Sequence, residues 1–141
     1  MDEFKKFLME LYTTRAISII KDLIEYWKIP YITLKDVFSI AYSENGAYKY
    51  LRENYNYNFP PLVYEKFRER FPLSEELSEG FKEVILMSNL DRQIRELSSL
   101  ISMKEALSLS KYSKLRKDMN LQELLKILDE ELEEMSKDNE Y

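Results

Sequence analysis

Residues 33–51, TLKDVFSIAYSENGAYKYL, place two short amphipathic segments on either side of a turn that contains a glycine. Thr33 and Asp36 have the spacing of a capping box, in which each side chain bonds the backbone N–H of the other residue at a helix start. Ser43–Gly46 predicts a tight turn, because Asn and Gly both tolerate positive φ. A second short helix is expected over residues 47–53. This order of elements has the arrangement of a helix-turn-helix unit.

The second helix of this unit has one apolar and one basic side. We expect Tyr48 or Leu51 to face the core, and Lys49, Tyr50 and Arg52 to face outward. A helix with this orientation can lie in the major groove of DNA and contact phosphates and bases. The competing interpretation is a plain helical bundle in which the same two helices are only joined by a glycine turn.

The segment 17–51, about a quarter of the chain, resembles the DNA-binding domain of TetR-type repressors. The positions that carry the resemblance are Thr33, Asp36, Val37, Ala41, Gly46, Tyr48 and Tyr50. The resemblance implies a recognition helix at Ala47–Arg52, with Lys49 and Tyr50 near phosphates. The turn is about one residue shorter than the family pattern, and Tyr42 stands where the family prefers glycine.

Helical periodicity extends along the rest of the chain. Apolar residues at three- and four-residue steps predict a long first helix over residues 3–28, which we expect to be the spine of the fold. Pro60 and Pro61 predict the start of another helix, about 62–71. The region around Ser88 and Asp91 predicts either a new helix, capped there, or one bent helix that continues through it.

The chain has only two glycines and four prolines in 141 residues, too few for the turns of a sheet-rich protein. We therefore expect an all-α fold: a single domain over residues 1–141, built as a compact bundle of five or six helices, with residues 17–59 as the helix-turn-helix-like unit. Asn120 with Glu123 predicts the cap of a last, acidic helix over residues 120–135, with leucines on one face.

Residues 54–59, NYNYNF, alternate asparagines with aromatic rings. Asn side chains can pair with base edges and aromatic rings can stack on bases, so a wing-like loop beside DNA is one interpretation. The others are a protein-contact surface and a loop whose rings cover the core. Tyr55 and Asn56 are the candidate DNA contacts in this segment.

Residues 111–117 form the densest positive run, with four basic side chains and no acid. These are Lys111, Lys114, Arg116 and Lys117, which we name as candidate phosphate contacts. The acidic helix follows at once, since residues 119–141 carry eight acidic and two basic groups, so an ion-paired arrangement of the two segments competes with DNA binding. The net charge of −5 comes from this end of the chain.

Several function classes find little support. The chain has no cysteine and no histidine, which excludes disulfides, thiol nucleophiles, Ser-His triads and nearly every zinc site. Glu75, Glu76, Glu79 and Glu83 have helical spacing and are expected to form a solvated face. We therefore expect no enzyme activity, no cofactor and no metal. No apolar run approaches 18 residues, and we expect no membrane association and a cytoplasmic location.

The hypothesis from the sequence is a small DNA-binding transcriptional regulator that dimerises through Leu124, Leu128 and Leu132 on its last helix. The alternative is a non-enzymatic helical subunit of a larger nucleoprotein or viral assembly. In that case the Tyr/Asn loop or the acidic helix would bind a protein partner.

Overall fold

The structure is a computed structural model that describes residues 14–72, 76–111 and 118–138, with the side chains of residues 102–111, 135, 136 and 138 left aside. Its helices are α2 (Ala16–Glu25), α3 (Leu34–Tyr42), α4 (Ala47–Tyr55), α5 (Pro61–Arg70), α6 (Glu79–Lys111) and α7 (Leu121–Asp138). Over these residues there is no β-strand, and Thr33 and Asn120 form only an isolated bridge. The expected all-α fold is confirmed.

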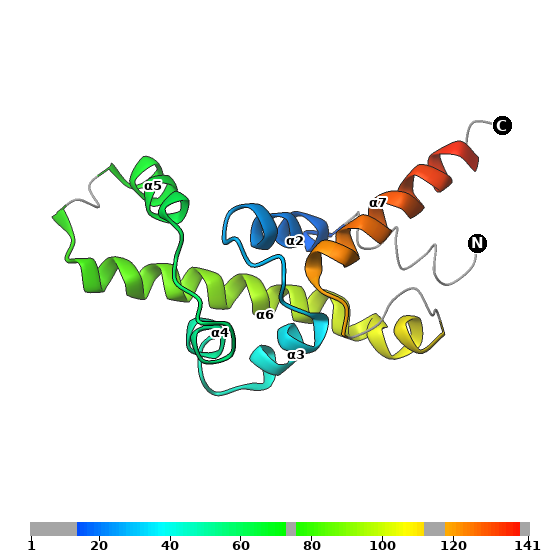
Figure 1. The fold of residues 1–141 in the computed structure, drawn as a ribbon, viewed down its shortest axis with the longest axis horizontal. Helices are drawn as coiled ribbons and strands as arrows, with labels where there is room; N and C mark the ends of the chain where they lie inside the picture. The colour runs from blue at the N-terminus through cyan, green and yellow to red at the C-terminus, as the bar shows by residue number, and fades with distance from the viewer. Residues whose placement is uncertain (1–13, 73–75, 112–117, 139–141) are drawn as a thin grey trace.

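Helix α6 is the spine of the molecule, with α2, α3 and α4 packed against it (Figure 1). Its buried stripe recurs at three- and four-residue steps and consists of Leu86, Leu90, Ile94, Leu97 and Ile101. Because the stripe continues without a break, no new helix is capped at Ser88. The single-helix alternative for this region is the one that forms.

The expectation of a first helix over residues 3–28 is wrong in its described part. Helix α2 begins at Ala16, after bends at residues 14 and 15, and ends at Glu25; residues 1–13 lie outside the described chain. Lys28 then adopts a left-handed conformation with φ of 60°. This turns the chain back, so that the Ile29 N–H donates to the Leu23 carbonyl at 2.9 Å. The helix therefore stops before the proline that was expected to end it.

The caps predicted at Thr33 and at Asn120 form. The Thr33 N–H donates to Asp36 Oδ2 at 2.9 Å, and the Asp36 N–H donates to Thr33 Oγ1 at 3.1 Å. At the start of α7 the Glu123 N–H donates to Asn120 Oδ1 at 2.8 Å. The two helix starts are also tied together, since the Leu121 N–H donates to the Ile32 carbonyl at 2.9 Å. Helix α5 begins at Pro61, as expected.

Every described helix contributes to one core. The buried apolar side chains form a single cluster, in which Trp27, Tyr57 and Phe59 are neighbours. The Tyr57 hydroxyl donates to the Trp27 carbonyl at 2.7 Å, which satisfies the polar end of a ring that is 5% exposed. The loop between α4 and α5 is thereby anchored in the core.

Candidate nucleic-acid interface

The turn between α3 and α4 is as sharp as the sequence predicts, but its backbone differs from the expectation. Gly46 is the N-cap of α4 with an extended conformation at φ of −75°, so no positive φ is used there. The Asn45 N–H donates to Ser43 Oγ at 3.0 Å inside the turn. The left-handed residue is Asn56, with φ of 54°, which ends α4. The turn thus depends on hydrogen bonding rather than on glycine's conformational freedom.

Two residues of α6, Asp91 and Arg95, form hydrogen bonds to this turn. The Arg95 guanidinium donates to the carbonyls of Ala41 at 2.8 Å, Ser43 at 3.0 Å and Asn45 at 3.3 Å. Its Nε also donates to Asp91 at 2.8 Å. These contacts satisfy carbonyls at the end of α3 and in the turn, which no helix bond could satisfy.

Asp91 acts on the other helix of the unit. Its Oδ1 accepts from the Ala47 N–H, the first backbone donor of α4, at 3.0 Å. Sequence reasoning placed Asp91 in the first turn of its own helix; instead it caps a helix 44 residues away in the chain. The Asp91–Arg95 pair therefore fixes where α3 ends and where α4 begins. Their i, i+4 spacing was visible in the sequence, but nothing in the sequence pointed to the turn as their partner.

A second set of bonds connects the start of α3 to the middle and the end of α4. Asp36, on the first turn of α3, accepts from the Tyr50 hydroxyl at 2.6 Å and from the Tyr55 hydroxyl. The Tyr55 ring also packs on Tyr31, with ring centroids 5.0 Å apart. Tyr50 was expected to face outward as a DNA contact, but it is half-buried and its hydroxyl is bonded to Asp36. α3 and α4 are thus joined at both ends.

Burial raises the pKa of Asp36, but hydrogen bonds from Tyr50, Tyr55 and Thr33 outweigh burial and hold its pKa below the usual range. Burial, together with the bond and negative charge of Asp36, raises the pKa of Tyr50 to about 12. The same causes raise the pKa of Tyr55. At neutral pH the cluster is one carboxylate that accepts from two neutral phenols.

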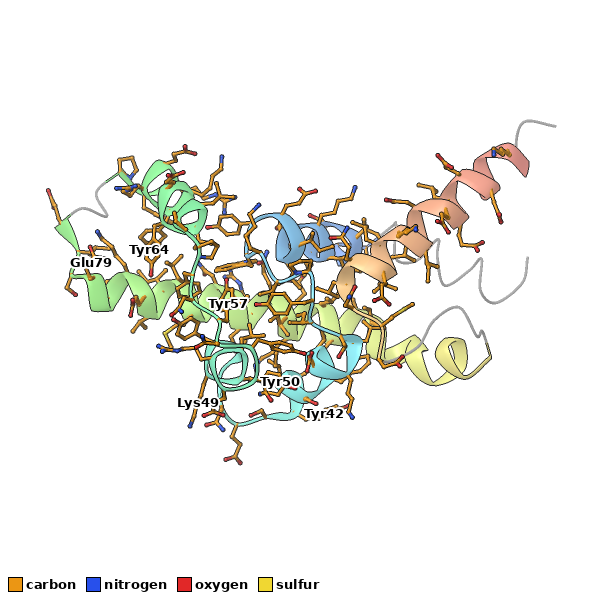
Figure 2. The ribbon with its side chains drawn as sticks, viewed as in Figure 1. Tyr42, Lys49, Tyr50, Tyr57, Tyr64 and Glu79 are labelled. Carbon is orange, nitrogen blue, oxygen red and sulfur yellow. The ribbon has the colours of Figure 1, made fainter. Side chains whose placement is uncertain are left out.

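The outward face of α4 carries Lys49 and Arg52, both exposed. Neither is paired with an acid within the described parts of the chain. The Arg52 guanidinium lies 5.8 Å from the centroid of the Tyr48 ring, a cation–π contact that orients it along the helix. Figure 2 places Lys49 on the side of α4 away from α6. The neighbouring surface also holds the exposed acids Glu44 and Glu53.

Most rings of the Tyr/Asn segment point into the core. Tyr57 and Phe59 are 5% and 8% exposed, and Tyr48 stacks on Phe59 with centroids 4.6 Å apart. Of the candidate DNA contacts in this segment, Asn56 is exposed and the Tyr55 hydroxyl is bonded to Asp36. The segment is therefore mainly cover for the core: Tyr57 and Phe59 are not available to stack on bases, and the Tyr55 ring is 37% exposed.

The expected dimer contact on α7 is also wrong for two of its three residues. Leu124 and Leu128 are 2% and 0% exposed because this face of α7 packs against α2 within the same chain. Leu132 is 38% exposed. Most of the leucine stripe that suggested self-association is therefore buried in the protein's own core.

Some predictions fall outside what is described. Lys114, Arg116 and Lys117 lie outside the described residues, as does the side chain of Lys111, and so does Glu75. Glu76, Glu79 and Glu83 are exposed. Among the residues with described positions, no three histidine, cysteine or carboxylate side chains gather in a way that could hold a metal ion. No helix in that part of the chain is long and apolar enough to cross a membrane.

No protein-family model matches this chain, and no curated protein and no solved structure shows significant similarity to it.

Proposed function

We propose that this protein binds duplex DNA by placing α4 in a groove. The observation that carries the proposal is the orientation of α4: its inner side is bonded to α3 and α6, and Lys49 and Arg52 extend from its outer side without an acidic partner among the described residues. A helix that enters a groove must keep its direction while its basic side chains reach phosphates. The resemblance of residues 17–51 to TetR-type repressors supports the same function.

The rigid hold on α4 supports the proposal energetically. Arg95 and Asp91 fix the helix at its start, and Asp36 holds it through Tyr50 in its middle and Tyr55 at its end. A preorganised helix loses little conformational entropy on binding, so more of the contact energy remains as affinity. The phosphate contacts would come from Lys49 and Arg52, and Asn56 lies at the end of the same helix, where its amide could reach the duplex.

A salt titration with a mixed-sequence duplex tests this function. We expect saturable binding at about 50 mM salt that weakens steeply toward about 200 mM, because each phosphate contact releases bound counterions. Lys49→Glu combined with Arg52→Glu should weaken binding at least tenfold and reduce the salt slope by about two.

The matched control is Lys21→Glu with Lys126→Glu, which makes the same charge change at exposed sites on α2 and α7. Those helices lie across α6 from α4 (Figure 1). If the control weakens binding as much as the α4 variant, the effect is net charge alone and the proposed interface is wrong. Absence of saturable binding at low salt would also end the proposal.

A second candidate is a helical interaction subunit that binds a basic protein through α7. Leu128 is the last fully buried leucine of this helix, and Asp129, Glu130 and Glu133 beyond it are exposed. Figure 1 shows α7 extending outward from the rest of the fold. Stable co-purification with one protein, lost in Asp129→Lys with Glu133→Lys and accompanied by no binding to DNA, would favour this candidate over the first.

A further inference from the structure

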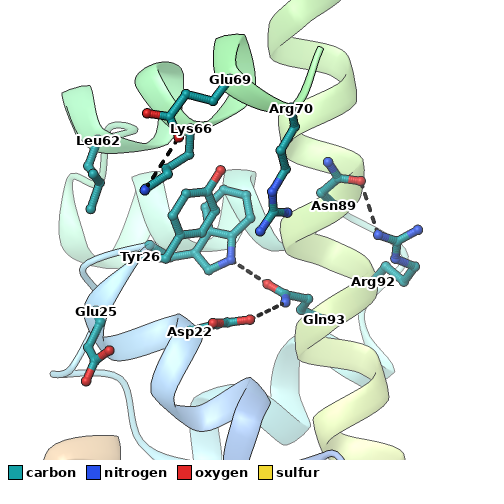
Figure 3. A pocket seen from close by; sticks show the side chains of 11 residues that line it. Asp22, Glu25, Tyr26, Leu62, Lys66, Glu69, Arg70, Asn89, Arg92 and Gln93 are labelled. Atoms are coloured by element: carbon teal, nitrogen blue, oxygen red, sulfur yellow. Dashed lines mark hydrogen bonds and ion pairs between the residues drawn. The ribbon is translucent and has the colours of Figure 1, made fainter.

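A cavity of about 460 Å³ lies between α2, α5 and α6, on the side of α6 away from the α3–α4 turn. Its volume is in the range of small-molecule sites, which are roughly 300–1,000 Å³. Figure 3 shows side chains from all three helices around it. It opens to the surface and is lined mainly by charged and amide groups, so its chemistry can be derived from them.

The cations come from α5 and α6. Lys66 and Arg70 are one turn apart on α5, and both extend toward the ring of Tyr26 (Figure 3). Arg92 lines the cavity from α6 and donates to Asn89 Oδ1 at a long 3.4 Å. Lys66 is 3.5 Å from the exposed Glu69, whereas Arg70 has no ion pair in the described part of the chain. A guanidinium has five donors, so Arg70 can bind an oxyanion in a bidentate manner.

The α2 side of the cavity supplies acceptors. Trp27 Nε1 donates to Gln93 Oε1 at 2.5 Å, and Gln93 Nε2 in turn donates to Asp22 Oδ2 at 3.2 Å. This chain of bonds fixes the Gln93 amide and orients the Asp22 carboxylate, and Glu25 lies one turn further along. Both acids are exposed and can accept hydrogen bonds from hydroxyl groups of a ligand.

The opposite charges meet across Tyr26, which is half-buried in the cavity wall. Burial raises the pKa of its phenol, the charge of Arg70 lowers it and the charge of Asp22 raises it. Its hydroxyl is occupied, since it donates to the Val63 carbonyl at 3.3 Å. The ring is thus a fixed surface with a cationic group on one side and carboxylates on the other.

We propose that this cavity binds a small hydroxylated phosphate ester, such as a sugar phosphate or a nucleoside monophosphate. Arg70 holds the phosphate, with Lys66 and Arg92 adding positive charge. Asp22 and Glu25 accept from the hydroxyl groups at the other end. A bare inorganic anion would use only the first set of contacts and a neutral nucleoside only the second, so the ligand that uses both binds best. This site is separate from the proposed DNA contacts on α4.

The test uses the full chain and two readouts. Trp27 is the protein's only tryptophan and bonds to a cavity residue, so its fluorescence reports on the site, and calorimetry provides an independent measurement. The probes are AMP and ribose 5-phosphate, compared with adenosine and inorganic phosphate, at low salt. We expect saturable binding of a phosphate ester, and at least tenfold weaker binding of adenosine and of phosphate.

Variants locate the binding. Lys66→Ala with Arg70→Ala should weaken the phosphate ester at least tenfold, because charge-assisted hydrogen bonds are lost. Arg68→Ala with Lys21→Ala is the matched control: both residues are exposed and neither lines the cavity, so affinity should stay within about twofold. Circular dichroism verifies that each variant is folded.

Four results would overturn the proposal, three of them at the cavity and one at α4. The first three are no binding of either ester below about 10 mM by both readouts, adenosine binding as tightly as AMP, and equal loss of affinity in the cavity variant and the control. Lys49→Glu with Arg52→Glu should leave ester binding unchanged. Loss of ester binding in that variant would mean that the phosphate is held at α4, which also overturns the cavity site, whereas failure of DNA binding alone would leave it intact.

Discussion

On one side of α6, Asp91 and Arg95 are bonded to the α3–α4 turn, while on the other side Asn89 and Gln93 line the cavity beside α2 and α5. Both regions are rich in charge, and they lie on the same two turns of one helix. In the turn region the Arg95 guanidinium and both carboxylate oxygens of Asp91 have hydrogen-bond partners in the backbone or in side chains. In the cavity Arg70 has no ion pair among the described residues. Charges with fixed partners position the backbone, and charges without them are available to a ligand.

The strongest test of this comparison is Asp36→Ala, which removes the acceptor of three hydrogen bonds. Two phenols and one backbone N–H lose their partner in a partly buried place, so we expect the free energy of unfolding to fall by about 3 kcal/mol. Urea denaturation measures it. Lys35→Ala, at the exposed neighbouring position, should change it by less than about 0.5 kcal/mol. A loss below about 1 kcal/mol for Asp36→Ala would mean that water replaces the carboxylate.

The next test compares two arginines about one turn apart on α6, of which Arg95 holds the turn and Arg92 lines the cavity. Arg95→Ala leaves three backbone carbonyls and Asp91 Oδ2 without their donor, while Asp91 Oδ1 keeps the Ala47 N–H, and the expected loss is about 2 kcal/mol. Arg92→Ala removes one long bond to Asn89, so it should cost less than about 0.5 kcal/mol. The same urea experiment measures both. Equal losses would contradict the division of α6 into a structural side and an open side.

A pH series sharpens the first prediction. Because the pKa of Asp36 is lower in the folded protein than in the unfolded chain, its ionised form stabilises the fold above the unfolded pKa of about 4. This contribution is lost as the pH falls through the folded pKa. The difference in unfolding free energy between the natural protein and Asp36→Asn should therefore shrink below about pH 4. A difference that stays constant down to pH 3 would show that charge on Asp36 is unimportant.

The smallest effect is expected in the cavity. Arg70→Ala should leave the free energy of unfolding within about 0.5 kcal/mol, because an exposed charge without a fixed partner contributes little to stability. Thermal and urea unfolding both measure this. A loss as large as that of Arg95→Ala would mean that Arg70 is structural, and the two regions would no longer differ in kind.

Local chemistry explains which parts of the fold were predictable. The Thr33–Asp36 and Asn120–Glu123 caps involve residues three apart, and both formed as expected. Pro60 and Pro61, at the cap and the first position of α5, also act locally. The end of α2 and the continuity of α6 were harder to predict. The chain turns back after α2 through the left-handed residue Lys28, and α6 continues because its buried stripe packs against other helices.

The candidate site divides in the same way. The sharp turn and the exposed Lys49 and Arg52 followed from the pattern of residues 33–51. The bond from Tyr50 to Asp36 did not, since a tyrosine at the edge of an amphipathic face fits either orientation. A leucine stripe likewise does not determine which helix will cover it. Leu124 and Leu128 are buried because α7 packs against α2 of the same chain.

By itself, the sequence determined that this chain is helical, where α3, α5 and α7 start, and that a helix with exposed basic side chains follows a tight turn. Those properties arise from backbone propensities and from contacts between residues three or four positions apart. Only the tertiary structure decided that Arg95 and Asp91 hold that turn and that charged groups of α2, α5 and α6 surround a cavity. These contacts join residues tens of positions apart, and their partners are chosen by how the helices pack, which no local pattern records.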